Sequence, residues 1–214
     1  MIIRNLILVL LLLFSSVNAS PYVDKKTLKR IAKKYKMFAK KRFYFLQVML
    51  DGVKNGTDMQ KLQAVNQFYN EVRYVPDIKV YGKKDYWATP YQFLGKDKGD
   101  CEDYVIAKYF ALIYLGMSSK KLFFTYVHST KFKAPHMVLT YFKTPRSEPL
   151  ILDNNNRKIF PASKRKDLIP IYNFNGDSLY RASKTGAGTG KKLKKQQSHK
   201  KWDQLKANIR KRVI

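Results

Sequence analysis

The order of helical and extended patterns along this chain limits its fold more than any other feature. Apolar residues recur at three- and four-residue steps in the first half, which predicts helices with one buried face. These segments are residues 24–51, 58–74 and 100–115. Short runs of branched and aromatic residues then predict strands joined by short links, at residues 122–128, 136–142 and 149–153, with a further candidate at 159–172. Helices that precede consecutive strands favour an α+β fold with an antiparallel sheet.

The first 19 residues have the pattern of an export signal. Arg4 is the only charged residue among them, an apolar run follows from Leu6 to Phe14, and the segment ends in small residues up to Ala19. A permanent membrane anchor is the alternative, but the run is far shorter than the roughly 20 residues that cross a bilayer. We therefore expect a signal peptide at residues 1–19 and export of the remaining chain.

Basic residues dominate the chain and concentrate toward its C-terminal end. Lys and Arg number 43 against 15 Asp and Glu, which gives a formal net charge of +28. Residues 181–214 hold twelve of the basic residues and a single acid, Asp203. We expect a domain over residues 20–180 and a basic tail over 181–214, with a short helix at 198–209. We interpret the tail as a solubilising extension that makes loose contact with anionic lipid or lipopolysaccharide.

The single cysteine, Cys101, lies at the start of the clearest predicted helix. One Cys excludes an intrachain disulfide and any zinc or iron–sulfur site built from several cysteines. A helix N-terminus stabilises a thiolate through its free N–H groups and the positive end of its dipole, which is the environment of a reactive cysteine. Four of the fifteen acids nevertheless surround this thiol within seven positions: Asp97, Asp100, Glu102 and Asp103.

These carboxylates require an explanation beyond helix capping. Acids in a first turn complement the helix dipole, which accounts for one or two of them. Their negative charge, however, opposes ionisation of the thiol beside them. A protonated histidine or a bound cation relieves this conflict, and oxygen ligands suit Ca²⁺. The sequence therefore predicts an imidazole near Cys101, with Ca²⁺ as a natural companion.

Three histidines are available as the partner of the thiol. His199 lies in the basic tail, and His128 ends the first predicted strand. His136 begins the next strand, and Asp153 ends the one after it. If these two strands are antiparallel neighbours, Asp153 comes within reach of the His136 ring. The order Cys101, His136, Asp153 then supplies a nucleophile, a base and an orienting carboxylate, with His128 left open as another base.

A resemblance to a known family rests on three stretches of the sequence. They are YWATPYQFLGKDKGDCEDYVIAKYFALIYLG at 86–116, HMVLTYF at 136–142 and LILDNNN at 150–156. These stretches resemble the bacterial transglutaminase-like cysteine proteinases, and among them the periplasmic proteases that release biofilm adhesins. The resemblance extends over about residues 62–172.

This resemblance implies a papain-like or transglutaminase-like α+β fold, with N-terminal helices and a catalytic Cys at a helix N-terminus packed on an antiparallel sheet. It implies a Cys101–His136–Asp153 triad and Ca²⁺-dependent activity. Matching the acids that surround the family's cysteine assigns the metal to Asp100 and Glu102, with Asp103 as a further ligand.

The resemblance also implies a substrate, a regulator and a location. The substrate is the N-terminal region of a large surface adhesin, cut at a paired-alanine site, so that the adhesin is released and the biofilm disperses. The regulator is an inner-membrane receptor for cyclic di-GMP that sequesters the protease. Together with the signal peptide, these implications predict a periplasmic endopeptidase.

Other functions stay open from the sequence alone. A transglutaminase or an amidase uses the same triad for a different acyl transfer. A non-enzymatic module that binds anionic polymers fits the net charge and the interleaved aromatic residues. Specific nucleic-acid binding is not expected, because the chain is exported and because 33 of the 43 basic residues are Lys, which lacks the bidentate fork of Arg.

Overall fold

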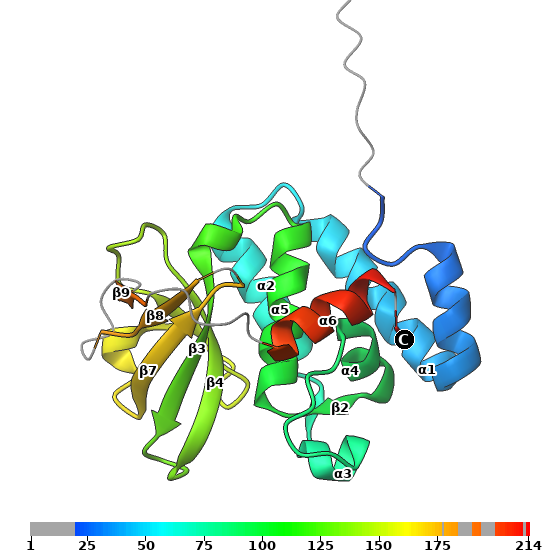
Figure 1. Cartoon of the computed structure of the whole chain (residues 1–214). Helices are drawn as coiled ribbons and strands as arrows, with labels where there is room; N and C mark the ends of the chain where they lie inside the picture. The colour runs from blue at the N-terminus through cyan, green and yellow to red at the C-terminus, as the bar shows by residue number, and fades with distance from the viewer. Residues whose placement is uncertain (1–19, 177, 184–189, 194–199, 212) are drawn as a thin grey trace, which may run out of the picture.

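The computed structural model describes residues 20–176, 178–183, 190–193, 200–211 and 213–214. Helices lie on one side of the molecule and an antiparallel sheet on the other, as Figure 1 shows. The predicted signal peptide at residues 1–19 and His199 lie outside the described residues. The α+β class predicted from the order of the patterns is confirmed.

Several of the described helices begin at residues whose side chains cap the first N–H groups. The described helices are α1 (Lys25–Val53), α2 (Asp58–Tyr69), α3 (Asp77–Tyr81), α4 (Pro90–Lys96), α5 (Cys101–Tyr114) and α6 (Lys200–Arg210), with 3-10 turns at Ser119–Lys121 and Ala162–Lys164. The Asp24 carboxylate accepts a hydrogen bond of 2.6 Å from the Thr27 N–H at the start of α1, and Thr57 forms a capping box with Gln60 at the start of α2. The short helices α3 and α4 are not predicted by hydrophobic periodicity, because neither spans the two or three turns that reveal it.

Among the described residues, the main sheet contains seven strands in the order β6-β5-β4-β3-β7-β8-β9, and every neighbouring pair is antiparallel. The strands are β3 (Leu122–Ser129), β4 (Ala134–Tyr141), β5 (Leu150–Leu152), β6 (Phe160–Pro161), β7 (Leu168–Phe174), β8 (Leu179–Arg181) and β9 (Lys191–Lys192). A separate parallel pair joins β1 (Arg73–Tyr74) to β2 (Lys98–Gly99). Because β4 and β5 are antiparallel neighbours, the chain enters β4 and leaves β5 at the same end of the strands.

The helix that begins at Cys101 is the central helix of the core. It packs against β4 of the sheet and against α2 and α4 on its other sides. Ten of its residues are buried, including Ile106, Ala107 and Leu112, which are fully buried. Apolar burial of this kind is the main stabilising contribution to a fold. It fixes the N-terminus of α5 at the start of β4.

Helix α1 is interrupted at Lys36, whose backbone has φ 68° and ψ −173°. The sequence places Leu28, Ile31, Tyr35 and Phe38 on one apolar face of a regular helix. Ile31 is fully buried, whereas Phe38 is 78% exposed. The change of direction at Lys36 takes Phe38 out of register with the residues before it, so the second half of α1 turns part of its apolar side to solvent.

The C-terminal region differs from the expected solubilising extension. Helix α6 buries Trp202 and Leu205, and the Trp202 ring packs against Phe110 of α5 with ring centroids 5.9 Å apart. Figure 1 shows α6 lying across the helical side of the molecule. Ile214 is buried, and Lys34 of α1 donates a hydrogen bond to its carbonyl. The described part of residues 181–214 therefore belongs to the folded body, because its apolar residues complete the core.

None of the helices described here combines the length and the apolar character that a membrane span needs. Helix α1 is long enough for that role, but its sequence is rich in lysine.

Candidate active site

Cys101 is the first residue of α5, and Asp100 precedes it in extended conformation. The thiol donates a hydrogen bond of 3.2 Å to Glu102 Oε2, and the backbone N–H of Met137 in β4 interacts with the sulfur. Because Met137 follows His136, this contact joins the start of α5 to the His136 end of β4. Burial, followed by the charge of Glu102, raises the pKa of the Cys101 thiol well above its ordinary value.

His136 and Asp153 form a buried hydrogen-bonded pair. His136 Nε2 lies 2.8 Å from Asp153 Oδ1. This bond leaves Nδ1 as the ring nitrogen for proton exchange with a neighbouring group. Burial by itself raises the pKa of Asp153, but the hydrogen bond and the charge of His136 outweigh it and lower that pKa to about 2. The other described histidine, His128, is in β3 and lies opposite Pro135 of β4.

Arg165 is a member of the site that the sequence analysis did not identify. Its Nη2 donates to Asp153 Oδ2 at 2.7 Å and to Asp167 Oδ2 at 2.8 Å, and its side chain is only 6% exposed. Burial alone lowers the pKa of Arg165, but the bonds to Asp167 and Asp153 more than compensate and raise it. No sequence motif marks Arg165, because its position depends on the 3-10 turn Ala162–Lys164 that brings the chain back to Asp153.

Helices α2 and α5 hold the loop that carries Asp153. Asn70, the C-cap residue of α2, donates from Nδ2 to the Asp153 carbonyl at 2.8 Å. The fully buried Lys108 of α5 donates from Nζ to Asn66 Oδ1 at 2.8 Å, and Asn66 in turn donates to the Arg157 carbonyl at 3.0 Å. Burial lowers the pKa of Lys108 to about 7, against the opposing charge of Asp153. These hydrogen bonds hold the backbone at Asp153 in one position.

Three carboxylates form a cluster at the start of α5, near Cys101. Ligand oxygens of Asp77, Asp100 and Asp103 lie within 4.8 Å of one another. Within the described part of the chain, Asp77 Oδ1, Asp100 Oδ1 and Asp103 Oδ2 are buried and have no hydrogen-bond partner. Buried carboxylate oxygens without donors are costly, and three carboxylates this close together suit a hard cation. The residues present therefore fit a divalent cation of the Ca²⁺ type.

All three acids expected as metal ligands lie in groups that could hold a metal ion. Asp100 and Asp103 belong to this cluster, and Glu102 belongs to a second such group with Asp100 and the Cys101 thiol, so its role as a ligand stays a prediction. Burial and the neighbouring Asp100 raise the pKa of Glu102 to about 9, and burial and the same Asp100 raise that of Asp77 to about 6. Asp77 was missed because it begins α3, far from Cys101 in sequence, and only the fold brings it to Asp100.

Gly99 allows the close approach on which this cluster depends. A Cβ at position 99 would lie 2.3 Å from Asp103 Oδ2 and 2.5 Å from the Phe93 ring. The other oxygen of Asp103 accepts a 2.9 Å hydrogen bond from the Ala88 N–H. The Asp103 carboxylate is therefore held between the backbone at Ala88 and the space left by Gly99.

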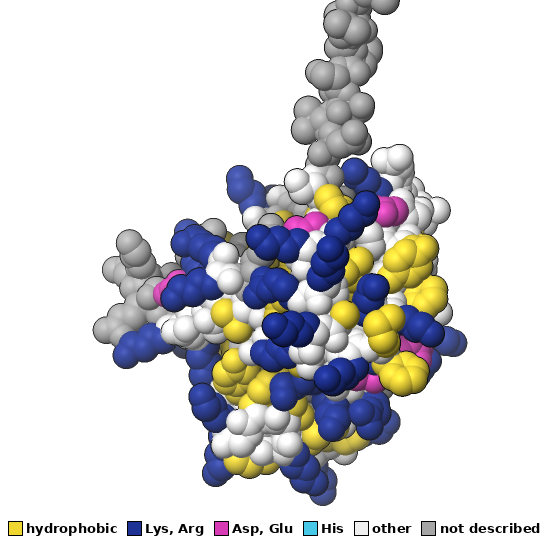
Figure 2. Space-filling view, turned by 90° about the vertical axis from the view of Figure 1, so that its right-hand side faces the viewer, with side chains coloured by type: hydrophobic (Ala, Val, Ile, Leu, Met, Phe, Trp, Pro, Cys, Tyr) yellow, Lys and Arg dark blue, Asp and Glu magenta, His cyan; other side chains and the backbone are white. Residues whose placement is uncertain are grey.

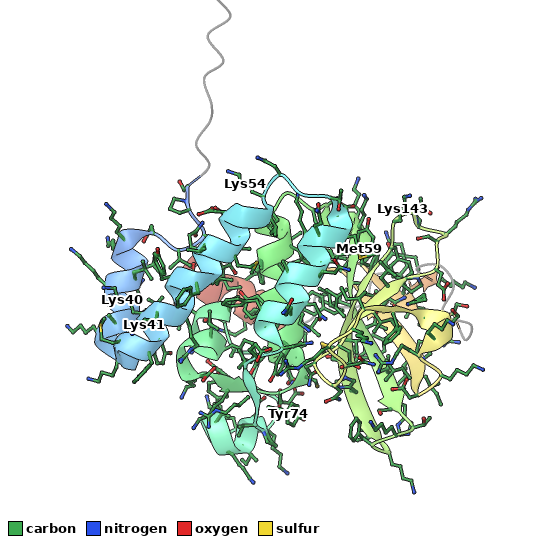
Figure 3. All side chains as sticks on the ribbon, turned by 180° about the vertical axis from the view of Figure 1, so that it is seen from behind. Lys40, Lys41, Lys54, Met59, Tyr74 and Lys143 are labelled. Carbon is green, nitrogen blue, oxygen red and sulfur yellow. The ribbon has the colours of Figure 1, made fainter. Side chains whose placement is uncertain are left out.

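Tyr74 is an exposed aromatic residue near the thiol. Its side chain is labelled in Figure 3, and 55% of the residue is exposed. Burial of its inner part, and then the charges of Cys101 and Asp100, raise its pKa to about 12. A neutral phenol near the Cys101 thiol offers both an apolar surface and a hydrogen-bonding group.

Comparisons with known proteins agree with this geometry. Residues 47–167 match the family model described as bacterial transglutaminase-like cysteine proteinase. Among solved structures, calcium-bound Legionella pneumophila LapG is 36% identical, with a TM-score of 0.74 over 86% of this chain and 98% of that one. EGTA-treated LapG from the same organism is also 36% identical, with a TM-score of 0.73 over 89% of this chain and 100% of that one.

No curated protein sequence matches the chain. The family match nevertheless covers more than half of the residues, and the structural match covers nearly the whole Legionella chain. The chain belongs to the bacterial transglutaminase-like cysteine proteinases and is a cysteine protease.

Proposed function

We propose that this protein is a periplasmic, calcium-dependent cysteine endopeptidase that uses Cys101, His136 and Asp153. Its substrate is the N-terminal region of a large surface adhesin, cut at a paired-alanine site so that the adhesin leaves the cell and the biofilm disperses. The observation that carries the proposal is the buried His136–Asp153 bond of 2.8 Å next to the backbone contact of Cys101 with β4.

The mechanism is acyl transfer to water. His136 Nδ1 takes the proton of Cys101, and the thiolate attacks the scissile carbonyl. The N–H of Cys101 is one of the groups at the N-terminus of α5 that have no acceptor within the helix, and it holds the developing oxyanion. His136 then protonates the leaving amine, and afterwards it activates the water that releases the acyl-enzyme. Asp153 keeps the imidazole in one tautomer throughout.

Ca²⁺ is held by Asp77, Asp100 and Asp103 in this proposal. The calcium-bound structure of Legionella LapG supports the choice of metal, and the three partnerless oxygens support the choice of ligands. A bound cation supplies positive charge that offsets the carboxylates around the thiol.

The location and the regulator are part of the same proposal. The N-terminal segment with the pattern of a signal peptide supports export to the periplasm. The family resemblance supports an inner-membrane cyclic di-GMP receptor that sequesters the protease. Sequestration rather than chemical modification suits an enzyme whose only thiol is its nucleophile.

The decisive experiment incubates the protein with the N-terminal region of a paired-alanine adhesin from the same organism. The arms contain Ca²⁺, EGTA, or Ca²⁺ with the Cys101→Ala variant. We expect cleavage only with Ca²⁺ and the thiol. Cleavage by Cys101→Ala would show that the assigned nucleophile is wrong. A fluorescent primary amine in one arm detects transglutamination, and its incorporation in place of cleavage would replace the protease by the amine-transfer alternative.

A further inference from the structure

The second half of α1 exposes a row of large apolar side chains. Phe38, Tyr44, Phe45 and their apolar neighbours lie on the side of α1 that faces away from the core. The exposed fractions are 56% for Met37, 78% for Phe38, 57% for Tyr44, 58% for Phe45 and 49% for Val48. A helical period places all five within one broad face of the helix. The opposite face buries Ala39, Phe43, Leu46 and Leu50 in the core, so the exposed row has no partner within the described part of the chain.

Lysines surround this apolar row. Lys41 lies among the apolar residues on the helical period and is exposed, and Lys33 and Lys36 are exposed in the turns before Met37. Figure 2 shows the face that includes α1, with apolar side chains grouped among many Lys and Arg and few acids. Lys40 and Lys41 point away from the body in Figure 3. The surface is therefore both apolar and strongly cationic.

The shape of this surface favours a bilayer over a protein partner. One cavity, of about 360 Å³, is lined by sheet residues such as Val127 and Val138 and by Arg165, and no residue of α1 contributes to it. The five apolar side chains of α1 project from a single helix and are about half exposed or more, whereas protein partners anchor their key residues in well-packed pockets. Diffuse Lys charge around protruding aromatic rings is typical of helices that lie in the plane of an anionic membrane.

We propose that the Met37–Val48 face of α1 docks the protein on an anionic phospholipid bilayer. Phe38 and Phe45 enter the interface between headgroups and acyl chains, and the surrounding lysines contact lipid phosphates. The apolar residues of this face belong to α1 and not to residues 181–214, so the site differs from the loose tail contact expected from the sequence. It places the protease at the membrane surface.

The test measures co-sedimentation of the chain from Ser20 onward with vesicles. One set of vesicles is phosphatidylcholine alone, and the other contains about one third phosphatidylglycerol. We expect binding to the anionic vesicles only, and about a tenfold loss of it in the double variant Phe38→Ser/Phe45→Ser. Unchanged melting temperatures will show that the exposed substitutions leave the fold intact. A Tyr44→Trp variant adds a fluorescence readout, which should shift to the blue on binding.

Two charge variants of equal size separate α1 from the C-terminal region. Lys33→Gln/Lys40→Gln/Lys41→Gln should weaken binding strongly, whereas Lys191→Gln/Lys192→Gln/Lys200→Gln should leave most of it. Full binding by the Phe38/Phe45 double variant would overturn the proposal. So would loss of binding confined to the Lys191/Lys192/Lys200 variant, or equal binding of the unaltered protein to both kinds of vesicle.

Discussion

Asp153 is held from several directions at once. His136 and the Asn155 N–H share Oδ1, and Arg165 binds Oδ2. Asn70 at the C-cap of α2 fixes the backbone carbonyl. Both carboxylate oxygens are thus occupied before any substrate arrives. A general base works best when its ring cannot rotate away from the nucleophile. Arg165 is accordingly a positioning residue, since it acts on His136 only through Asp153.

Replacing Asp153 by Asn separates orientation from folding. The Asn amide keeps the shape of the carboxylate but offers His136 an NH₂ group, which holds the imidazole ring in the wrong tautomer. We therefore expect kcat to fall by about 10³-fold to 10⁴-fold. Asp167→Asn is the matched control, because it removes the other partner of Arg165 without touching His136. It should leave kcat within a few-fold of the original. Parallel losses of kcat and of melting temperature in Asp153→Asn would make this residue structural.

Acid should destabilise the protein through Asp153. Its pKa is about 2 in the folded state, against an ordinary 3.8. A lowered pKa contributes stability that is present above pH 3.8 and is lost as the pH falls toward 2. The contribution is about 2 kcal/mol for a shift of this size. Urea titrations between pH 5 and pH 2 should show this loss in the original protein and not in Asp153→Asn, and identical pH profiles would contradict it.

Asp77 provides a test of the cation cluster that does not depend on catalysis. If it binds the cation with Asp100 and Asp103, then Asp77→Asn should weaken Ca²⁺ affinity at least about tenfold, because a charged ligand is lost. Calorimetric titration and the rise in melting temperature with added Ca²⁺ both report this affinity. The exposed Asp51→Asn on α1 should bind Ca²⁺ as the original does. Equal affinity in both variants would exclude Asp77 as a ligand.

At the scale of secondary structure, local patterns predict the parts of the site that are local. The start of α5 at Cys101, the strand that carries His136 and the strand that ends just before Asp153 are all visible in the hydrophobic period and the turn residues. Asp77 and Arg165 are not, since each meets its partner only through tertiary contacts made by a short helix or a 3-10 turn. The interruption at Lys36 has no sequence signal that we recognise. It is the reason that Phe38 is exposed although the period predicts burial.

Gly99 gives a sharp test of the connection between β2 and α5. Gly99→Ala forces a Cβ against the Asp103 carboxylate and the Phe93 ring, so we expect a loss of about 1–3 kcal/mol in stability and weaker Ca²⁺ binding. Gly52→Ala is the control, because no atom lies within 4 Å of its added Cβ and it lies in α1. That change should stabilise the helix by up to about 1 kcal/mol. A neutral Gly99→Ala would show that Asp103 is free to move.

At the scale of the molecule, α6 is part of the core rather than an appendage. Trp202 contacts aromatic rings of both layers, Phe110 in α5 and Phe124 in β3, at centroid distances of 5.9 Å and 5.3 Å. Trp202→Ala should therefore cost about 3–5 kcal/mol, measured by urea unfolding. The exposed Gln204→Ala on the same helix should change stability by less than about 0.5 kcal/mol. A small effect of Trp202→Ala would mean that α6 is only loosely attached.

The position of α6 makes the folding of α5 depend on a segment that is synthesised much later. One face of α5 is covered by Trp202 of α6, which packs on Tyr109 and Phe110. While the ribosome has yet to make α6, these two rings have no cover and the core around α5 is incomplete. We therefore expect proteolytic activity to appear only after α6 has been synthesised and has packed on α5.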